Sequence, residues 1–176
     1  MTGPTLTSRA KPTPRRLNLV LRDSTVIEGW IHIGDEQTLV QYLNTRRGGG
    51  FNVTRARRPR LDEPPGHIIA QAEHIVMASA PDGAIAVGGT SGIGTEERPV
   101  EVVLLGGHTV RGFLAAAPQQ RLSDVIAACG KFIGLPRATL KDGRELGDVV
   151  LHSGAIEFLR DLRATAGLDE GGSAPL

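Results

Sequence analysis

The chain has 176 residues and a formal net charge of +1, and 40% of its residues are hydrophobic but only 3% aromatic. This length allows one domain or two small ones, and the near-neutral charge draws the whole protein to neither nucleic acid nor membrane. A single cysteine, Cys129, excludes an intrachain disulfide. Since no apolar run approaches the roughly 20 residues of a membrane span, we expect a cytoplasmic protein without membrane insertion.

Three segments have the composition of tails or linkers. Residues 1–16 lack acidic residues and are rich in Thr, Arg and Pro, which predicts a disordered N-terminal tail. Residues 81–99 carry five glycines between two prolines and are interpreted as a linker. Residues 165–176 are small and polar, which predicts a second tail. The segments between them, residues 17–80 and 100–164, are the candidate folded units.

These two units repeat one another, which predicts an internal duplication. The first stretch, LNLVLRDSTVIEGWIHI, aligns with VEVVLLGGHTVRGFLAA at a constant offset of 83. Further along, QTLVQYLN aligns with QRLSDVIA at the same offset. After a two-residue shift, Phe51 aligns with Phe132, and HIIAQAEHIVM aligns with DVVLHSGAIEF at offset 81.

Each repeat opens with two predicted strands. Leu17, Leu19 and Leu21 alternate with other side chains, which is the period of a half-buried strand. A turn at Asp23-Ser24 leads into a second strand over residues 26–33. The glycine within that strand, Gly29, and its counterpart Gly112 would weaken a regular strand, so they indicate a sharp bend or a close backbone approach.

The period then changes to that of a helix. Leu39, Tyr42 and Leu43 stand at i, i+3 and i+4, which predicts one apolar helix face. The second repeat has the same pattern over residues 122–129, with Gly130 placed as the C-terminal cap. The final strands are predicted over residues 51–57, 67–72 and 73–78, and over 132–140, 148–152 and 155–159. The fold class is therefore mainly β with short helices.

The stretch AIAVGGTSGIG has, in Gly88, Gly92 and Gly94, the glycine spacing of a dinucleotide-binding loop. Such a loop must open a helix whose N-terminus faces the pyrophosphate. Pro99 ends any helix within one turn of this loop. We therefore interpret the stretch as linker and predict no cofactor.

Part of the second repeat resembles the Sm motif of Sm-like RNA-binding proteins. VEVVLLGGHTVRGFL has Gly107 and Gly112 at the glycine positions of that motif, and VVLHSGAIEFL resembles its closing segment. RLSDVIAACGKFIGLPRATL is also similar to a family of bacterial small-barrel proteins with an R-L-S-D-x-L-N-like helix and no assigned activity. The resemblance implies two tandem small Sm-like β-barrel repeats, each with an inserted short helix. In place of the Arg-Gly that completes the Sm RNA pocket, this chain has His152-Ser153.

A basic cluster in the first repeat is the candidate contact surface. Such a cluster neutralises phosphates, but single-strand binders also supply aromatic stacking platforms, and only Phe51 lies nearby in the sequence. We interpret the cluster as a solvated face or a contact for phosphate or for a partner. Its members are Arg46, Arg47, Arg55, Arg57, Arg58 and Arg60.

The sequence predicts neither a catalytic residue nor a metal site, since its histidines stand at no ligand spacing. The predicted function is a non-enzymatic scaffold or assembly module that binds protein or itself through sheet edges and barrel faces. RNA or DNA binding through the basic cluster is the alternative. Four apolar residues, two in the last strand of each repeat, are the candidates for edge pairing. They are Ile75, Met77, Ile156 and Phe158.

Overall fold

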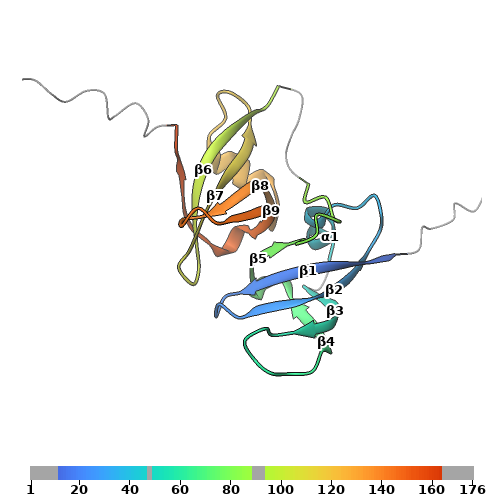
Figure 1. Cartoon of the computed structure of the whole chain (residues 1–176). Coiled ribbons are helices and arrows are strands. Elements are labelled where there is room, and N and C mark those ends of the chain that lie inside the picture. The colour runs from blue at the N-terminus through green and yellow to red at the C-terminus, as the bar shows by residue number, and fades with distance from the viewer. Residues whose placement is uncertain (1–11, 47–48, 89–93, 164–176) are drawn as a thin grey trace, which may run out of the picture.

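A computed structural model describes residues 12–46, 49–88 and 94–163. Over these ranges the chain is mainly β, as predicted, and ten antiparallel strands form one open sheet in the order β10-β6-β7-β8-β9-β5-β1-β2-β3-β4 (Figure 1). The strands are β1 (Thr13–Leu21), β2 (Val26–Ile33), β3 (Gly50–Arg57), β4 (Gly66–Gln71), β5 (Ile75–Ser79), β6 (Glu96–Leu104), β7 (His108–Ala116), β8 (Phe132–Leu140), β9 (Glu145–His152) and β10 (Ile156–Asp161).

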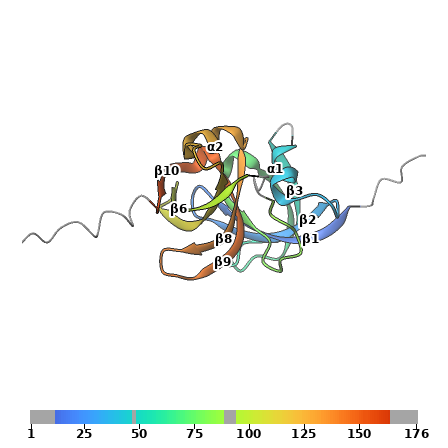
Figure 2. The same cartoon turned by 90° about the horizontal axis from the view of Figure 1, so that it is seen from above.

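Two α-helices and two 3-10 turns complete the described structure. They are α1 (Leu39–Asn44), α2 (Leu122–Ala128), η1 (Ala72–His74) and η2 (Ser153–Ala155). Figure 2 shows α1 and α2 on the same side of the sheet. No helix in the described ranges is long and apolar enough to cross a membrane.

The expectation of two separate barrels is corrected, because the strands of both halves join in one sheet. The join is β5 against β9, which lie side by side where the two halves meet (Figure 1). Each half nevertheless has the same internal order, with β5-β1-β2-β3-β4 in the N-terminal half and β10-β6-β7-β8-β9 in the C-terminal half. The registers agree as well, since Leu19 pairs with Ala78 and its counterpart Val102 pairs with Leu159.

The predicted alignment of Phe51 with Phe132 is wrong by one position. Phe51 pairs with Ala70, and Ile133 pairs with Leu151, the counterpart of Ala70. The residue equivalent to Phe51 is therefore Ile133 and not Phe132. Because neighbouring residues of a strand face opposite sides, Phe132 points the other way and packs in the core of the N-terminal half.

The core of each half contains side chains from the other half. The N-terminal core includes Phe132 and Val150 from β8 and β9. In return, Val76 and Met77 of β5 pack in the C-terminal core with Leu135. The junction thus buries apolar side chains from both halves in addition to pairing their backbones.

The two mid-strand glycines allow the close approach that the sequence predicts. A Cβ atom on Gly29 would lie 2.4 Å from Cγ1 of Val53, and one on Gly112 would lie 2.6 Å from Cγ of Leu135. Real side chains do not tolerate such distances. In each half, β2 or β7 therefore passes directly against the apolar side chain of the next strand.

Helix α1 has a complete N-terminal cap and a fully buried face. The backbone N–H of Gln41 donates to Oγ1 of Thr38 at 3.2 Å, and the N–H of Thr38 donates to Oε1 of Gln41 at 3.0 Å. This reciprocal pair satisfies two of the N–H groups that a helix start leaves unpaired. Leu39, Tyr42 and Leu43 are buried, as their spacing predicts.

Helix α2 differs from α1 in both respects. Its N-cap residue, Arg121, makes no capping hydrogen bond through its side chain. Only Val125 of its predicted apolar face is buried, while Leu122 and Ile126 are half-buried. Gly130, at φ +80°, follows the helix as the sequence predicts.

The expected tail and linker boundaries are also corrected. β1 begins at Thr13, within the expected N-terminal tail, and β6 begins at Glu96, within the expected linker. Residues 84–88 of that linker pack against α1, with Ile85 and Val87 buried. The five glycines between two prolines led to the linker interpretation, which overlooked the apolar run of residues 84–87.

Candidate functional site

The edge of β5 is closed inside the chain. β5 pairs with β1 on one side and with β9 on the other, where Met77 stands opposite Leu151 and Ala78 opposite Val150. Ile75 is fully buried and Met77 is 7% exposed. Neither residue lies at a free edge, contrary to the sequence-based expectation, because β9 of the other half occupies that edge.

The two ends of the sheet order, β10 and β4, carry the free edges of the described sheet. Phe158 of β10 is 49% exposed and Ile69 of β4 is 67% exposed. Ile156, also on β10, is half-buried. Large exposed apolar side chains on an unpaired edge are typical of a strand that pairs with another chain.

Ile69 was missed by the sequence analysis, although the signal was present in HIIAQ. Ile69 stands in β4 where Val150 stands in β9, and Val150 is fully buried because β5 pairs with that strand. Phe158 likewise stands in β10 where Met77 stands in β5. The exposed residues at both ends of the sheet therefore correspond to residues that the central junction buries.

Three arginines of the basic cluster are engaged by other side chains of the molecule. Arg57 donates to Oε2 of Glu28 from both Nε (3.0 Å) and Nη2 (2.7 Å), and Arg58 pairs with Glu63. The Arg46 guanidinium lies 4.1 Å above the Tyr42 ring at the end of α1. These three cations already have partners within the molecule.

Two members of the cluster remain available. Arg55 is exposed, with a left-handed φ of 49°, and it borders a hollow with Arg57 and Trp30. Arg60 is exposed beside a different hollow, in the segment between β3 and β4. Neither Arg55 nor Arg60 makes an ion pair within the described ranges, and Arg47 lies outside them.

His152 occupies the end of β9 beside the junction. Its ring meets the Phe132 ring edge-on at 4.9 Å between centroids, and its buried Nδ1 has no hydrogen-bond partner among the described residues. Burial lowers the pKa of His152 below 6.5, and the nearby positive charges of Arg22 and Lys131 lower it further. The geometry therefore favours a neutral imidazole that packs as an aromatic ring.

Gly88 of the glycine-rich stretch packs closely against β8. A Cβ atom on Gly134 of β8 would lie 1.9 Å from the carbonyl oxygen of Gly88. Gly94 leads into strand β6 and not into the helix that a dinucleotide loop requires. Gly92 lies outside the described residues.

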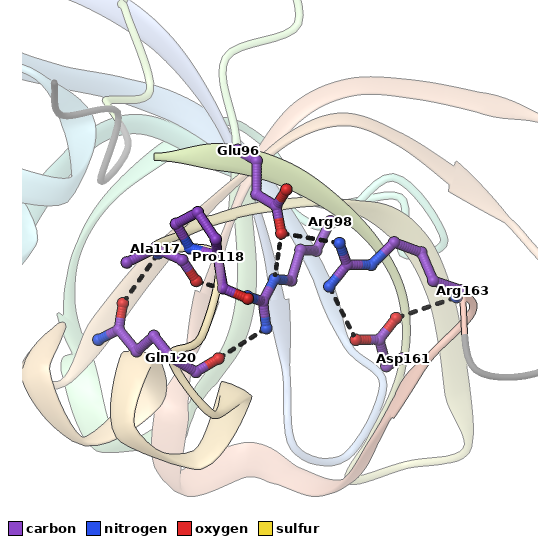
Figure 3. Close-up of polar contacts among 7 residues, drawn as sticks. All are labelled: Glu96, Arg98, Ala117, Pro118, Gln120, Asp161 and Arg163. Carbon is purple, nitrogen blue, oxygen red and sulfur yellow. Dashed lines mark hydrogen bonds and ion pairs between the residues drawn. The ribbon is translucent and has the colours of Figure 1, made fainter. Parts of the chain in front are cut away.

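A buried arginine that the sequence analysis missed organises the loop before α2 (Figure 3). Arg98 of β6 donates to the carbonyl oxygens of Ala117, Pro118 and Gln120 and pairs with Glu96 at 3.2 Å. A buried charge needs such saturation. The sequence analysis placed Arg98 in the linker over residues 81–99, where an arginine is expected to be solvated.

Glu96 links this arginine to the end of β10. Arg163 donates to Oε1 of Glu96 at 2.8 Å and pairs with Asp161 at 3.5 Å. The hydrogen bond from Arg163 lowers the pKa of the Glu96 carboxyl, and Arg98 lowers it further. The network joins β6, β10 and the loop before α2.

Comparisons with known proteins add no assignment. No protein-family model matches the chain, and neither a curated protein nor a solved structure matches it.

Proposed function

We propose that the chain is a non-enzymatic scaffold, an internally duplicated Sm-like module that binds further copies of itself through the free edges of β4 and β10. The observation that carries this proposal is the β5–β9 junction, where the last strand of one half pairs with the fourth strand of the other. β10 and β4 are the remaining last and fourth strands. Matching strand order and register in the two halves support the duplication.

The junction supplies a template for the contact between chains. In its register, Phe158 of β10 stands opposite Ala70 of β4, and Leu159 stands opposite Ile69. The contact joins two different surfaces, so each chain keeps one free edge of each kind after pairing. A heterologous contact of this type builds a ring or a filament.

Burial of the two exposed side chains supplies a driving force. Burying a large apolar side chain completely stabilises by roughly 1.5–3 kcal/mol, and Phe158 and Ile69 each retain about half or more of their surface in contact with water. Backbone hydrogen bonds of the new strand pair add to this and fix the direction of approach.

Light scattering at micromolar concentration tests the proposal. We expect a mass that is a multiple of 18.6 kDa. Ile69→Lys blocks β4 and Phe158→Lys blocks β10, so each variant alone cannot propagate the contact and runs as a monomer. Mixing the two variants restores one open edge of each kind, and a complex of one copy of each should form.

Leu61→Lys is the matched control, because Leu61 is 47% exposed but lies between β3 and β4 and outside both edge strands. This variant should keep the mass of the unchanged chain. A mass of 18.6 kDa for the unchanged chain at every concentration would refute self-association. Association of the Ile69→Lys variant with itself would refute the heterologous contact in favour of a two-fold β10–β10 pair.

A further inference from the structure

A groove of about 710 Å³ opens between α2, the loop before it and β10. Leu122 and Ile126 of α2 and Leu159 of β10 form its apolar part, and all three side chains are half-buried. Arg98 and Asp161 lie at its polar end (Figure 3). We refer to this feature as the α2 groove.

The equivalent place in the N-terminal half is filled. Leu39, Leu43 and Ala78 are the counterparts of the three apolar groove residues, and they are 0%, 2% and 0% exposed. The cavity that remains beside the start of α1 measures only about 50 Å³. The difference arises because residues 84–88 cover α1.

This covering segment holds α1 through both backbone and side chains. The N–H groups of Leu39 and Val40 donate to the carbonyl oxygens of Ala86 and Val87, at 2.9 and 3.0 Å. Ile85 and Val87 insert their side chains into the same core cluster as Leu39. An extended segment with apolar residues at i and i+2 is thus what this kind of groove accepts.

We propose that residues 164–176 of this chain occupy the α2 groove as residues 84–88 occupy the groove of α1. Residues 84–88 follow β5, and residues 164–176 follow β10, its counterpart. Leu159 and Asp161 of β10 line the groove themselves, so the chain leaves the sheet at the groove. This inference is independent of the edge pairing proposed above.

The sequence of the segment fits the groove in two ways. Ala166 and Leu168 have the i, i+2 spacing of Ile85 and Val87. Asp169-Glu170 follow directly, and Arg121 at the rim of the groove is exposed. Opposite charges at the rim favour one direction of the bound segment.

The amide groups of Leu122 and Ser123 test this inference, because they are the counterparts of the Leu39 and Val40 donors. Hydrogen exchange is measured in a chain that carries both Ile69→Lys and Phe158→Lys, so that edge pairing does not contribute. Removal of residues 164–176 should accelerate exchange at Leu122 and Ser123 at least tenfold, while Leu39 and Val40 keep their rates. Adding a synthetic peptide of residues 164–176 should restore the slow exchange.

A pair of point variants in the otherwise unchanged chain gives a second measurement. Leu168→Ser should accelerate exchange at Leu122 and Ser123, and Leu176→Ser, a matched change in the same segment, should accelerate it less. Equal exchange at Leu122 and Ser123 with and without residues 164–176 would overturn the inference. So would an acceleration that affects Leu39 and Val40 equally, since that outcome reports global destabilisation.

Discussion

Asn44 at the end of α1 pairs with the backbone of Phe132 in β8, as a neighbouring strand would. Its Nδ2 donates to the carbonyl oxygen of Phe132 at 3.0 Å, and its Oδ1 accepts from the Phe132 N–H at 2.9 Å. One side chain of the N-terminal half thereby satisfies both backbone groups of a residue in the C-terminal half. The contact ties the halves together beside the β5–β9 junction.

Asn44→Ala should lower the free energy of unfolding by about 1–3 kcal/mol, because it leaves both backbone groups of Phe132 without their partner. Denaturant unfolding measures the effect. Asn52→Ala is the control, since Asn52 is exposed on β3 and its loss should change stability by less than about 0.5 kcal/mol. Equal effects of the two variants would show that the Asn44 contact does not stabilise the junction.

Gly134→Ala should destabilise the fold by about 3 kcal/mol or more, because the new Cβ would lie 1.9 Å from the backbone oxygen of Gly88. The segment over α1 must move away from β8 to accommodate it. Gly66→Ala is the matched control, because nothing lies within 4 Å of a Cβ at that position. Thermal unfolding compares the two, and a Gly134→Ala protein with unchanged stability would contradict the close packing of residues 84–88 on β8.

His152 should make stability depend on pH. Burial holds the pKa of the folded state below 6.5, so the unfolded chain takes up a proton at pH values where the folded chain does not. The free energy of unfolding should therefore fall as pH drops from about 6.5 toward the folded pKa, by at most about 1.4 kcal/mol per pH unit. Above that range both states are neutral and His152 contributes no slope.

The control for this effect separates His152 from the other histidines. His152→Gln should reduce the slope below pH ~6.5, and His67→Gln should leave it unchanged because His67 is exposed on β4. Urea unfolding at a series of pH values gives both slopes. A slope unaffected by His152→Gln would mean that another group titrates.

Binding of phosphate by the basic cluster should depend on the arginines that lack ion pairs. We expect weak retention on heparin, and loss of that retention in an Arg55→Ala, Arg60→Ala double variant. The Arg57→Ala, Arg58→Ala control should lose less, since Glu28 and Glu63 already neutralise those side chains. No retention of the unchanged chain at low salt would remove nucleic acid as a partner.

Local patterns in the sequence determined the elements of this protein. Alternation of Leu17, Leu19 and Leu21 identified the first strand, and the i, i+3, i+4 spacing of Leu39, Tyr42 and Leu43 identified α1. The repeated glycine at positions 29 and 112 predicted a close approach that both halves contain. These features were accessible because each depends on residues a few positions apart, whose side-chain directions follow from the geometry of a strand or a helix.

Tertiary structure alone decided which edges of these elements meet. Periodicity shows which face of a strand is buried but not which neighbour donates to its backbone, so Ile75 and Met77 were expected at a free edge and lie inside the junction. The same limit hid Ile69, because periodicity does not show that β4 pairs with β3 alone and leaves its other side free in the described sheet. Burial of Ile85 and Val87 on α1 likewise depends on the course of the chain after β5. A glycine-rich composition does not predict that course.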